Sequence, residues 1–274
     1  MKRTSTKRLI EAALMVALAT VLSIIKVVEM PYGGSVTLAS MLPIIILSYR
    51  NGLGWGMGGA LTYAVIQQLL GLKTLSYFTT PESVIAIILL DYILAFAVAG
   101  LGGLFRRIIK RQSSAIVIGS VCVSALRYIC HVISGCTVWV GLSIPDAAAF
   151  WYSIGYNATY MLPEAIILAA VGYYLCDMID FTKDVPTRTV RRARSGEAGM
   201  LYSLSGLLLL LGLITDVVLI APTLQNEVSG MFDLAGLLSV NWLAVGIVTA
   251  LAVAVAVGIF VYAVKKENKG SAAE

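Results

Sequence analysis

The sequence predicts an all-α integral membrane protein, and two observations carry this prediction. Of the 274 residues, 59% are hydrophobic and only 13% are charged, which leaves too little polar surface to cover a soluble globule of this length. The hydrophobic residues also gather in apolar runs, several of them close to the roughly 20 residues with which a helix crosses about 30 Å of hydrocarbon. A soluble enzyme is therefore excluded at the outset.

Eight apolar runs fit membrane-spanning helices. The first run is long and is followed by Glu29-Met30-Pro31-Tyr32 rather than by a small-residue cleavage site, so we expect it to be retained and not removed as a signal peptide. The second run is short and contains Pro43. The predicted spans are residues 9–28, 38–49, 52–72, 82–104, 114–140, 149–176, 200–220 and 241–264.

These spans divide the chain into three parts and fix its orientation. Residues 1–180 hold six spans, residues 181–199 form a polar, basic linker on the cytoplasmic side, and residues 200–274 hold two further spans. With both termini in the cytoplasm, all 20 lysines and arginines except Lys26, Lys73 and Arg127 fall on the cytoplasmic side, as the positive-inside rule requires. We expect a multi-pass protein of the plasma membrane that contacts lipid. This distribution explains the net charge of +5 without a nucleic-acid partner.

The fifth span carries the polar residues around which we expect a site. It contains the only histidine, His131, together with Arg127 and Trp139. Ionisable side chains in hydrocarbon cost several kcal/mol unless they face a protein interior or a wet cavity. The spacing of the three residues places them within one broad face of the helix, so this face is expected to look inward.

Polar residues of three helices converge at two depths. At about 1.5 Å per residue from the outer helix ends, His131, Asp91 and Asn157 each lie roughly 12 to 15 Å below the outer surface. Arg127 and Glu164 lie deeper, at about 20 Å, where they can neutralise each other as a buried structural ion pair. The convergence predicts an outward-opening pocket with an ion pair at its floor.

Each of these residues also has a simpler interpretation. Asp91 and His131 could share a structural hydrogen bond. Trp139 and Tyr152, near the outer boundary, could be aromatic-belt anchors. Asn157 could serve hydrogen bonding between helices.

No sequence motif indicates catalysis within this chain. It contains no GxxxxGK[ST] phosphate loop, no HExxH and no GxSxG pattern. The four cysteines lack the paired spacing of a metal site or a disulfide framework, and we interpret them as buried thiols. We therefore predict no catalytic residue, no metal and no cofactor in this chain. The cysteines are Cys122, Cys130, Cys136 and Cys176.

Motifs in four segments of residues 1–180 form a recognisable pattern. They are Pro31-Tyr32-Gly33-Gly34-Ser35-Val36-Thr37-Leu38 after the first span, Leu90-Asp91-Tyr92 in the fourth, Arg127-Tyr128, His131, Ser134-Gly135 and Trp139 in the fifth, and Tyr152, Tyr156-Asn157 and Leu162-Pro163-Glu164 in the sixth. Together they resemble the thiamine-specific substrate-binding (S) components of energy-coupling factor (ECF) transporters. The spacing across three helices makes the combination more specific than any single motif.

The resemblance implies a function and a set of site residues. It implies a six-helix fold, a loop after the first helix that lids an outward-facing vitamin site, and a separate coupling module of one membrane subunit and two ATPases that use ATP. The last two spans have no counterpart in that fold. Asp91 stands where the family usually has a longer glutamate. By position, the implied thiamine-binding residues are Asp91, His131, Trp139, Tyr152 and Asn157, with Tyr92 and Tyr32 as further candidates.

Two interpretations remain open for a pair of alanines in the first span. Ala13 and Ala17 form a small-xxx-small pattern that allows close approach of another helix. That helix could belong to this chain or to the coupling module, and the resemblance favours the module.

A second function also deserves a test. A proton-coupled secondary transporter of a small cationic or heterocyclic solute would also use Asp91 and His131. Such folds usually show internal repeats, and the sequence shows none between its halves.

Overall fold

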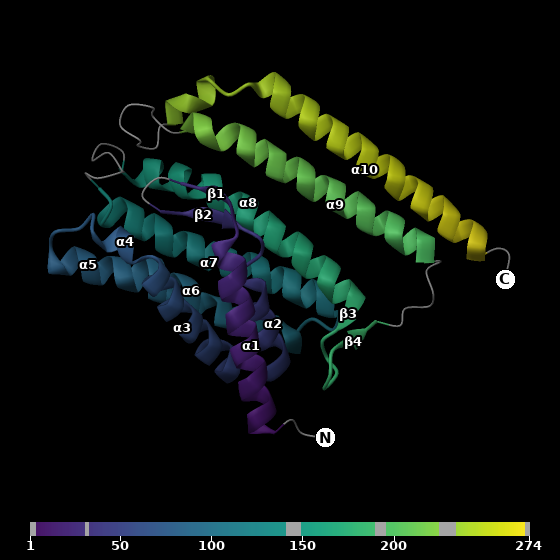
Figure 1. The fold of residues 1–274 in the computed structure, drawn as a ribbon, viewed down its shortest axis with the longest axis horizontal. Coiled ribbons are helices and arrows are strands. Elements are labelled where there is room, and N and C mark those ends of the chain that lie inside the picture. Colours follow the sequence, from purple (N-terminus) through teal and green to yellow (C-terminus); the bar gives the residue numbers. More distant parts are fainter. Residues whose placement is uncertain (1–3, 31–32, 141–148, 190–195, 225–233, 272–274) are drawn as a thin grey trace. The chain divides into compact units, whose positions relative to one another are not determined.

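The computed structural model describes residues 4–30, 33–140, 149–189, 196–224 and 234–271. They form two compact units, of which the first extends to Thr187 and the second begins at Arg188. Both units consist almost entirely of helices (Figure 1), so the predicted all-α class is confirmed. Within the described ranges, four segments are long and apolar enough to cross a membrane. They are Pro81–Arg107, Gln112–Thr137, Ala149–Met178 and Trp242–Ala263.

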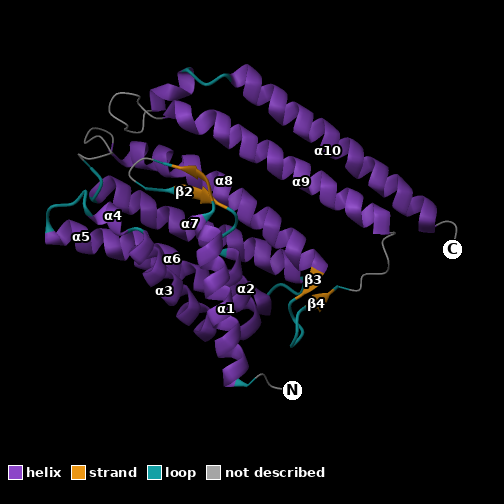
Figure 2. Ribbon diagram, viewed as in Figure 1, coloured by secondary structure: helices purple, strands orange, loops and turns teal. Residues whose placement is uncertain are grey.

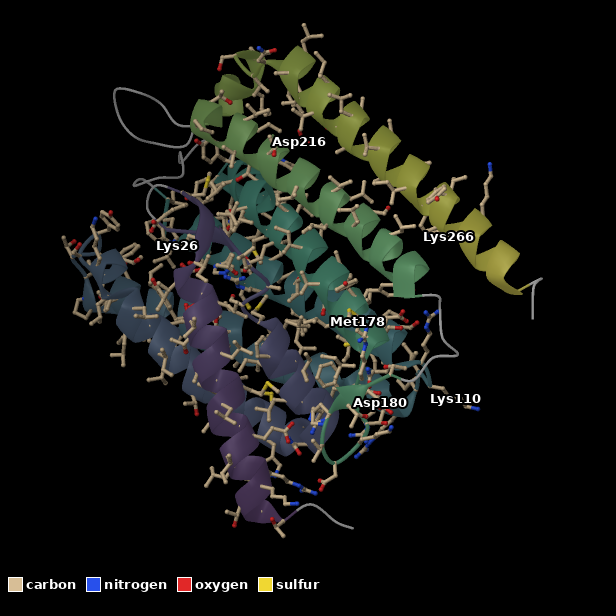
Figure 3. The ribbon with its side chains drawn as sticks, turned by 45° about the vertical axis from the view of Figure 1, so that its right-hand side comes forward. Lys26, Lys110, Met178, Asp180, Asp216 and Lys266 are labelled. Atoms are coloured by element: carbon tan, nitrogen blue, oxygen red, sulfur yellow. The ribbon has the colours of Figure 1, made fainter. Side chains whose placement is uncertain are left out.

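The helices of the first unit follow the order of the six predicted spans, most with ends shifted by a few residues. Figure 3 places Lys26 and Lys110 toward opposite ends of this unit. In chain order the elements are α1 (Ser5–Ile24), β1 (Lys26–Glu29), β2 (Ser35–Thr37), α2 (Leu42–Asn51), α3 (Leu53–Leu70), α4 (Leu72–Leu75), α5 (Pro81–Ile87), η1 (Ile88–Leu94), α6 (Ala95–Ala97), η2 (Val98–Arg107), α7 (Gln112–Thr137), α8 (Ala149–Met178), β3 (Ile179–Asp180) and β4 (Thr187–Arg188).

The predicted C-terminal end of the first span, at residue 28, was wrong, because α1 ends at Ile24. Residues 26–29 leave the helix and form β1, which pairs antiparallel with β2 so that Glu29 lies opposite Ser35. The β-branched Val27 and Val28 favour an extended strand once a partner strand is present. Figure 2 shows the resulting β1–β2 hairpin in orange, beside α8.

The fourth span is one helical path whose winding changes along its length. Thr80 caps α5 by accepting a hydrogen bond from the backbone N–H of Ser83, and Pro81 opens the helix. The path then widens into the π-helical η1, which carries Asp91, and tightens into the 3₁₀-helical η2. Short π-helical stretches are frequently found at functional sites.

The core of the first unit lies around α2. This helix has only 10 residues, half the length that a membrane span needs, and those from Leu42 to Arg50 are all buried. Glycines of η2 allow the close approach, since a Cβ on Gly103 would come within 2.4 Å of the Ser48 backbone. The predicted second span is thus a short helix enclosed by its neighbours.

The second unit is a helical hairpin. A Cβ on Gly212 of α9 would lie 2.5 Å from Ala252 of α10, so the two helices pack closely there. The Thr249 hydroxyl donates to Asp216 at 2.7 Å, and Figure 3 labels Asp216 within this unit. Many of the described apolar side chains on both helices are exposed. Its elements are α9 (Gly196–Ile220), η3 (Ala221–Leu224), η4 (Leu234–Leu238) and α10 (Trp242–Ser271).

Candidate substrate-binding site

The carboxylate of Asp91 lies at the centre of a largely buried polar cluster. His131 Nδ1 lies 2.9 Å from one of its oxygens. The other oxygen accepts hydrogen bonds from Ser134 Oγ at 2.8 Å and from Trp139 Nε1 at 2.9 Å. Only 13% of the Asp91 side chain and 11% of the His131 side chain are exposed. The structure therefore brings three of the predicted site residues together, and adds Ser134.

Local structure explains how α7 presents these donors. His131 and Ser134 are three residues apart and share one face of the helix. The carbonyl oxygen of Ser134 accepts the backbone N–H groups of both Val138 and Trp139, which ends the helix. The chain turns there and brings the Trp139 indole back to Asp91.

One ring nitrogen of His131 is available to accept a hydrogen bond from a ligand. Because a carboxylate only accepts hydrogen bonds, the hydrogen of a neutral imidazole belongs on Nδ1, which faces Asp91. Nε2 is then an acceptor, and it is buried without a hydrogen-bond partner in the structure. A buried polar atom without a partner is costly, so this nitrogen is suited to a ligand that donates a hydrogen bond.

Asn157 ties α8 to the same site. Its amide nitrogen donates to the carbonyl oxygens of His131 at 3.2 Å and of Ser153 at 2.9 Å. Its amide oxygen accepts from Tyr160 Oη at 2.6 Å. The Tyr160 ring in turn lies edge-on to the His131 imidazole, with 6.3 Å between centroids. From the side of α8, Asn157 thus holds the His131 backbone and Tyr160 contacts the imidazole.

Aromatic side chains extend the cluster beyond Trp139. The ring of Phe78 packs edge-on against the Trp139 indole with centroids 4.8 Å apart, and the ring of Tyr77 lies 6.2 Å away. Both come from the segment between α4 and α5. A cationic ligand near Asp91 would therefore meet an aromatic surface as well as a negative charge.

The predicted deep ion pair lies one helical turn from His131 along α7. Arg127 Nη1 donates to Glu164 Oε2 at 2.9 Å, and both side chains are more than nine-tenths buried. The guanidinium also lies 4.6 Å above the ring of Phe96. The two charges balance each other inside the bundle, as they must at this depth.

The hydroxyl of a further proposed thiamine-binding residue, Tyr92, does not join this cluster. The Tyr92 hydroxyl turns toward α4, where it bonds to Thr74 Oγ1 at 3.0 Å and to the Gly71 carbonyl oxygen at 3.3 Å. Tyr152 is half-buried near the start of α8, five residues before Asn157. Tyr32 lies outside the described residues.

Two residues of the cluster were not selected from the sequence. Ser134 could have been found, because it follows His131 at the i, i+3 spacing of one helix face. Tyr160 follows Asn157 at the same spacing along α8, but the sequence does not show that its ring lies beside His131. Among the residues that the structure describes, no group of His, Cys, Asp and Glu side chains could hold a metal ion.

The small-residue pair of α1 lies on the exposed side of its helix. Ala13 and Ala17 are exposed. The residues of α1 that face the bundle are a separate stripe, Ala12, Val16, Ala19 and Ser23.

Comparisons with known proteins place the first unit in a family. The thiamine transporter protein family matches residues 9–183, well over half of the chain. The thiamine transporter ThiT of Bacillus subtilis is 38% identical over 180 residues, which cover 60% of this chain and 87% of that protein. A solved structure of ThiT from Listeria monocytogenes matches with a TM-score of 0.50 at 22% identity, covering 62% of this chain and 92% of that one, so it supports the fold. The chain belongs to the thiamine transporter protein family.

Proposed function

We propose that this chain binds thiamine at the Asp91 cluster and carries it across the plasma membrane as the S component of an ECF transporter. The observation that carries the proposal is the Asp91 carboxylate, held beside His131 and Trp139 inside a membrane bundle. The relative from Bacillus subtilis is named as a thiamine transporter. As a member of a transporter family, the chain is not an enzyme.

The chemistry of thiamine fits the groups that this site offers. Its thiazolium ring carries a permanent positive charge, which a buried carboxylate and an aromatic face stabilise. Its aminopyrimidine ring carries an amine that can donate to His131 Nε2. Asp91 is one methylene shorter than glutamate, and the three donors around it hold the carboxylate close to α7.

Radiolabelled thiamine binding to the purified protein tests the site. Asp91→Asn should weaken binding by about 1.5 to 3 kcal/mol, the range for losing a charge-assisted contact, and should affect a neutral thiamine analogue less. Asp180→Asn is the matched control, because Asp180 lies outside the site and bonds to Thr182. Unchanged thiamine affinity in folded Asp91→Asn would disprove the assignment.

Transport requires energy that this chain does not supply by itself. The sequence contains no phosphate-binding loop, so we expect ATP to be used by two ATPases of a coupling module with one membrane subunit. The exposed face of α1, where Ala13 and Ala17 lie among large apolar side chains, is the surface we assign to that module. Small residues there let a partner helix approach closely. We propose that both termini lie in the cytoplasm, which places Ala13 and Ala17 in the cytoplasmic half of α1.

Substitution of both alanines by tryptophan tests this surface. Ala13→Trp with Ala17→Trp should leave thiamine binding by the isolated protein nearly intact and abolish both ATP-dependent uptake and co-purification with the module. Ala12→Trp on the buried side of α1 should instead reduce the yield of folded protein. Full uptake with both tryptophans present would place the docking surface elsewhere.

The comparisons give no support to a proton-coupled carrier. Purified protein in liposomes provides the direct test. Thiamine accumulation driven by a proton gradient, in the absence of any ATPase, would favour that mechanism over ECF coupling.

A further inference from the structure

A strongly basic stretch lies at the junction of two segments that are long and apolar enough to cross a membrane. Pro81–Arg107 ends in this stretch, and Gln112–Thr137 begins directly after it. We call residues 106–111 the basic loop, and four of its six residues are lysine or arginine. Because both neighbouring segments leave the hydrocarbon here, the basic loop lies at the surface of the membrane. Its sequence is Arg106-Arg107-Ile108-Ile109-Lys110-Arg111.

The first and last residues of the basic loop bind other parts of the protein. Arg106 Nη1 donates to the carbonyl oxygens of Tyr49 at 2.7 Å and Arg50 at 2.9 Å, near the C-terminal end of α2. Its guanidinium lies 5.3 Å from the centroid of the Tyr49 ring. At the other end of the loop, Arg111 pairs with Asp177 of α8 at 3.6 Å. These two arginines therefore hold the basic loop against α2 and α8.

The residues between them are free. Arg107 and Lys110 are exposed, and neither side chain pairs with an acidic group in the part of the chain that the structure describes. Ile108 stands between them with 78% of its surface exposed, the largest value among the large apolar side chains described in the first unit. The positive-inside rule accounts for the side of the membrane on which the two cations lie. It does not account for an exposed isoleucine between two unpaired cations.

A phospholipid with a net negative charge complements this surface. Its phosphate oxygens accept charge-assisted hydrogen bonds from a guanidinium and an ammonium group. Its acyl chains begin directly below the phosphate, where they can cover an isoleucine that is unfavourable in water. A zwitterionic lipid such as phosphatidylcholine carries a cation beside the same phosphate, so its attraction to two further cations is weaker.

We propose that the basic loop binds the headgroup of an anionic phospholipid through Arg107 and Lys110, with Ile108 against the upper part of the acyl chains. Arg106 and Arg111 are positioning residues that fix the loop at the membrane surface. Figure 3 places Lys110 toward the end of the unit that carries Asp180 and away from Lys26. We expect this end in the cytoplasm, and the cytoplasmic leaflet is the one whose anionic lipids attract basic segments.

Native mass spectrometry of the purified full-length protein tests the proposal. The protein is equilibrated in detergent with equal amounts of phosphatidylglycerol and phosphatidylcholine of identical chains. The wild type should retain phosphatidylglycerol in preference. Arg107→Gln with Lys110→Gln should lower the binding constant of phosphatidylglycerol by about twentyfold, since each basic residue near an anionic surface contributes roughly a factor of five. Phosphatidylcholine binding should hardly change. Ile108→Ser should weaken the binding of both lipids alike, by about fivefold.

Lys26→Gln with Lys73→Gln is the matched control. It also removes two positive charges, but from β1 and α4 rather than from the basic loop, and it should keep the preference for phosphatidylglycerol. An equal loss in this control would show that net charge alone decides, and would overturn the proposal.

Three further results would also overturn it. They are equal retention of both lipids by the wild type, an unchanged preference in the variant that lacks Arg107 and Lys110, and displacement of phosphatidylglycerol by an equal concentration of inorganic phosphate. Thermal unfolding in detergent shows whether each variant is folded. If the double variant does not fold, Lys110→Gln alone decides, with an expected loss of about fivefold in phosphatidylglycerol binding.

Discussion

Two buried polar clusters of the first unit differ in how fully their central group is satisfied. In the first cluster, which surrounds Arg50, every nitrogen of the guanidinium has a partner. Nε pairs with Glu11 of α1, Nη1 donates to the carbonyl oxygens of Phe181 at 2.7 Å and Lys183 at 3.3 Å, and Nη2 donates to that of Asp184 at 3.1 Å. In the second cluster, around Asp91, His131 Nε2 is buried without a hydrogen-bond partner.

The difference separates a structural cluster from a binding cluster. The Arg50 partners come from α1 and from the segment after α8, so the cluster joins distant parts of the chain. The Asp91 cluster keeps capacity for a ligand: the carboxylate has about four acceptor positions of which three are used, and His131 Nε2 has no partner. Variants in the two clusters should therefore change different quantities.

The largest expected effect concerns Arg50. Arg50→Met should lower the free energy of unfolding by about 3 to 5 kcal/mol, because Glu11 and three carbonyl oxygens lose their partner in a buried place. Thermal unfolding in detergent measures this loss. The exposed Arg107→Met serves as control. A folded Arg50→Met protein with normal stability and weakened thiamine binding would reverse the distinction between the clusters.

Trp139 should show the opposite pattern. Trp139→Ala should weaken thiamine binding by roughly tenfold through the lost aromatic contact with a cation, with a smaller effect on thermal stability. Trp139→Phe should lose less, because it keeps an aromatic face although it no longer donates to Asp91. Equal affinities for both variants and the wild type would show that the Trp139 ring does not contact the ligand.

Ser134 should have a smaller effect on the same quantity. Ser134→Ala removes one hydroxyl donor that orients the Asp91 carboxylate. Because the ligand feels this loss only through Asp91, the expected cost is about 0.5 to 1.5 kcal/mol of binding free energy, below the full range for a bond to a charged group. Isothermal titration with thiamine can resolve a change of this size. Ser124→Ala is the control, a buried serine of the same helix whose hydroxyl has no partner in the structure, and it should bind as the wild type does.

Tyr92 should have the smallest effect. Its hydroxyl bonds to Thr74 and Gly71 rather than to the cluster, so Tyr92→Phe should change thiamine affinity by less than about threefold, the range of a lost neutral hydrogen bond acting indirectly. The same titration detects the outcome. A loss of tenfold or more would mean that the hydroxyl contacts the ligand.

The sequence was informative where one helix determines the outcome. Depth and helix face follow from residue spacing, so Asp91, His131 and Asn157 could be placed at one level and Trp139 on the same helix face as His131. That the Trp139 indole reaches Asp91 could not be predicted in this way. The β1–β2 hairpin could not be predicted in this way, because Val27 and Val28 extend an apolar run and only their pairing with residues 35–37 makes them a strand. The π-helical winding around Asp91 likewise depends on packing rather than on local sequence.

The attachment of α1 has a mechanical consequence. This helix faces the bundle through a narrow stripe of mostly small side chains. Two polar contacts join it to its neighbours: Glu11 pairs with Arg50 of α2, and Ser23 Oγ accepts a hydrogen bond from Gln67 Nε2 of α3 at 2.8 Å. A force applied to the exposed face of α1, between these two contacts, therefore acts on α2 and α3 before α1 can move alone. A load on α1 is therefore shared with α2 and α3.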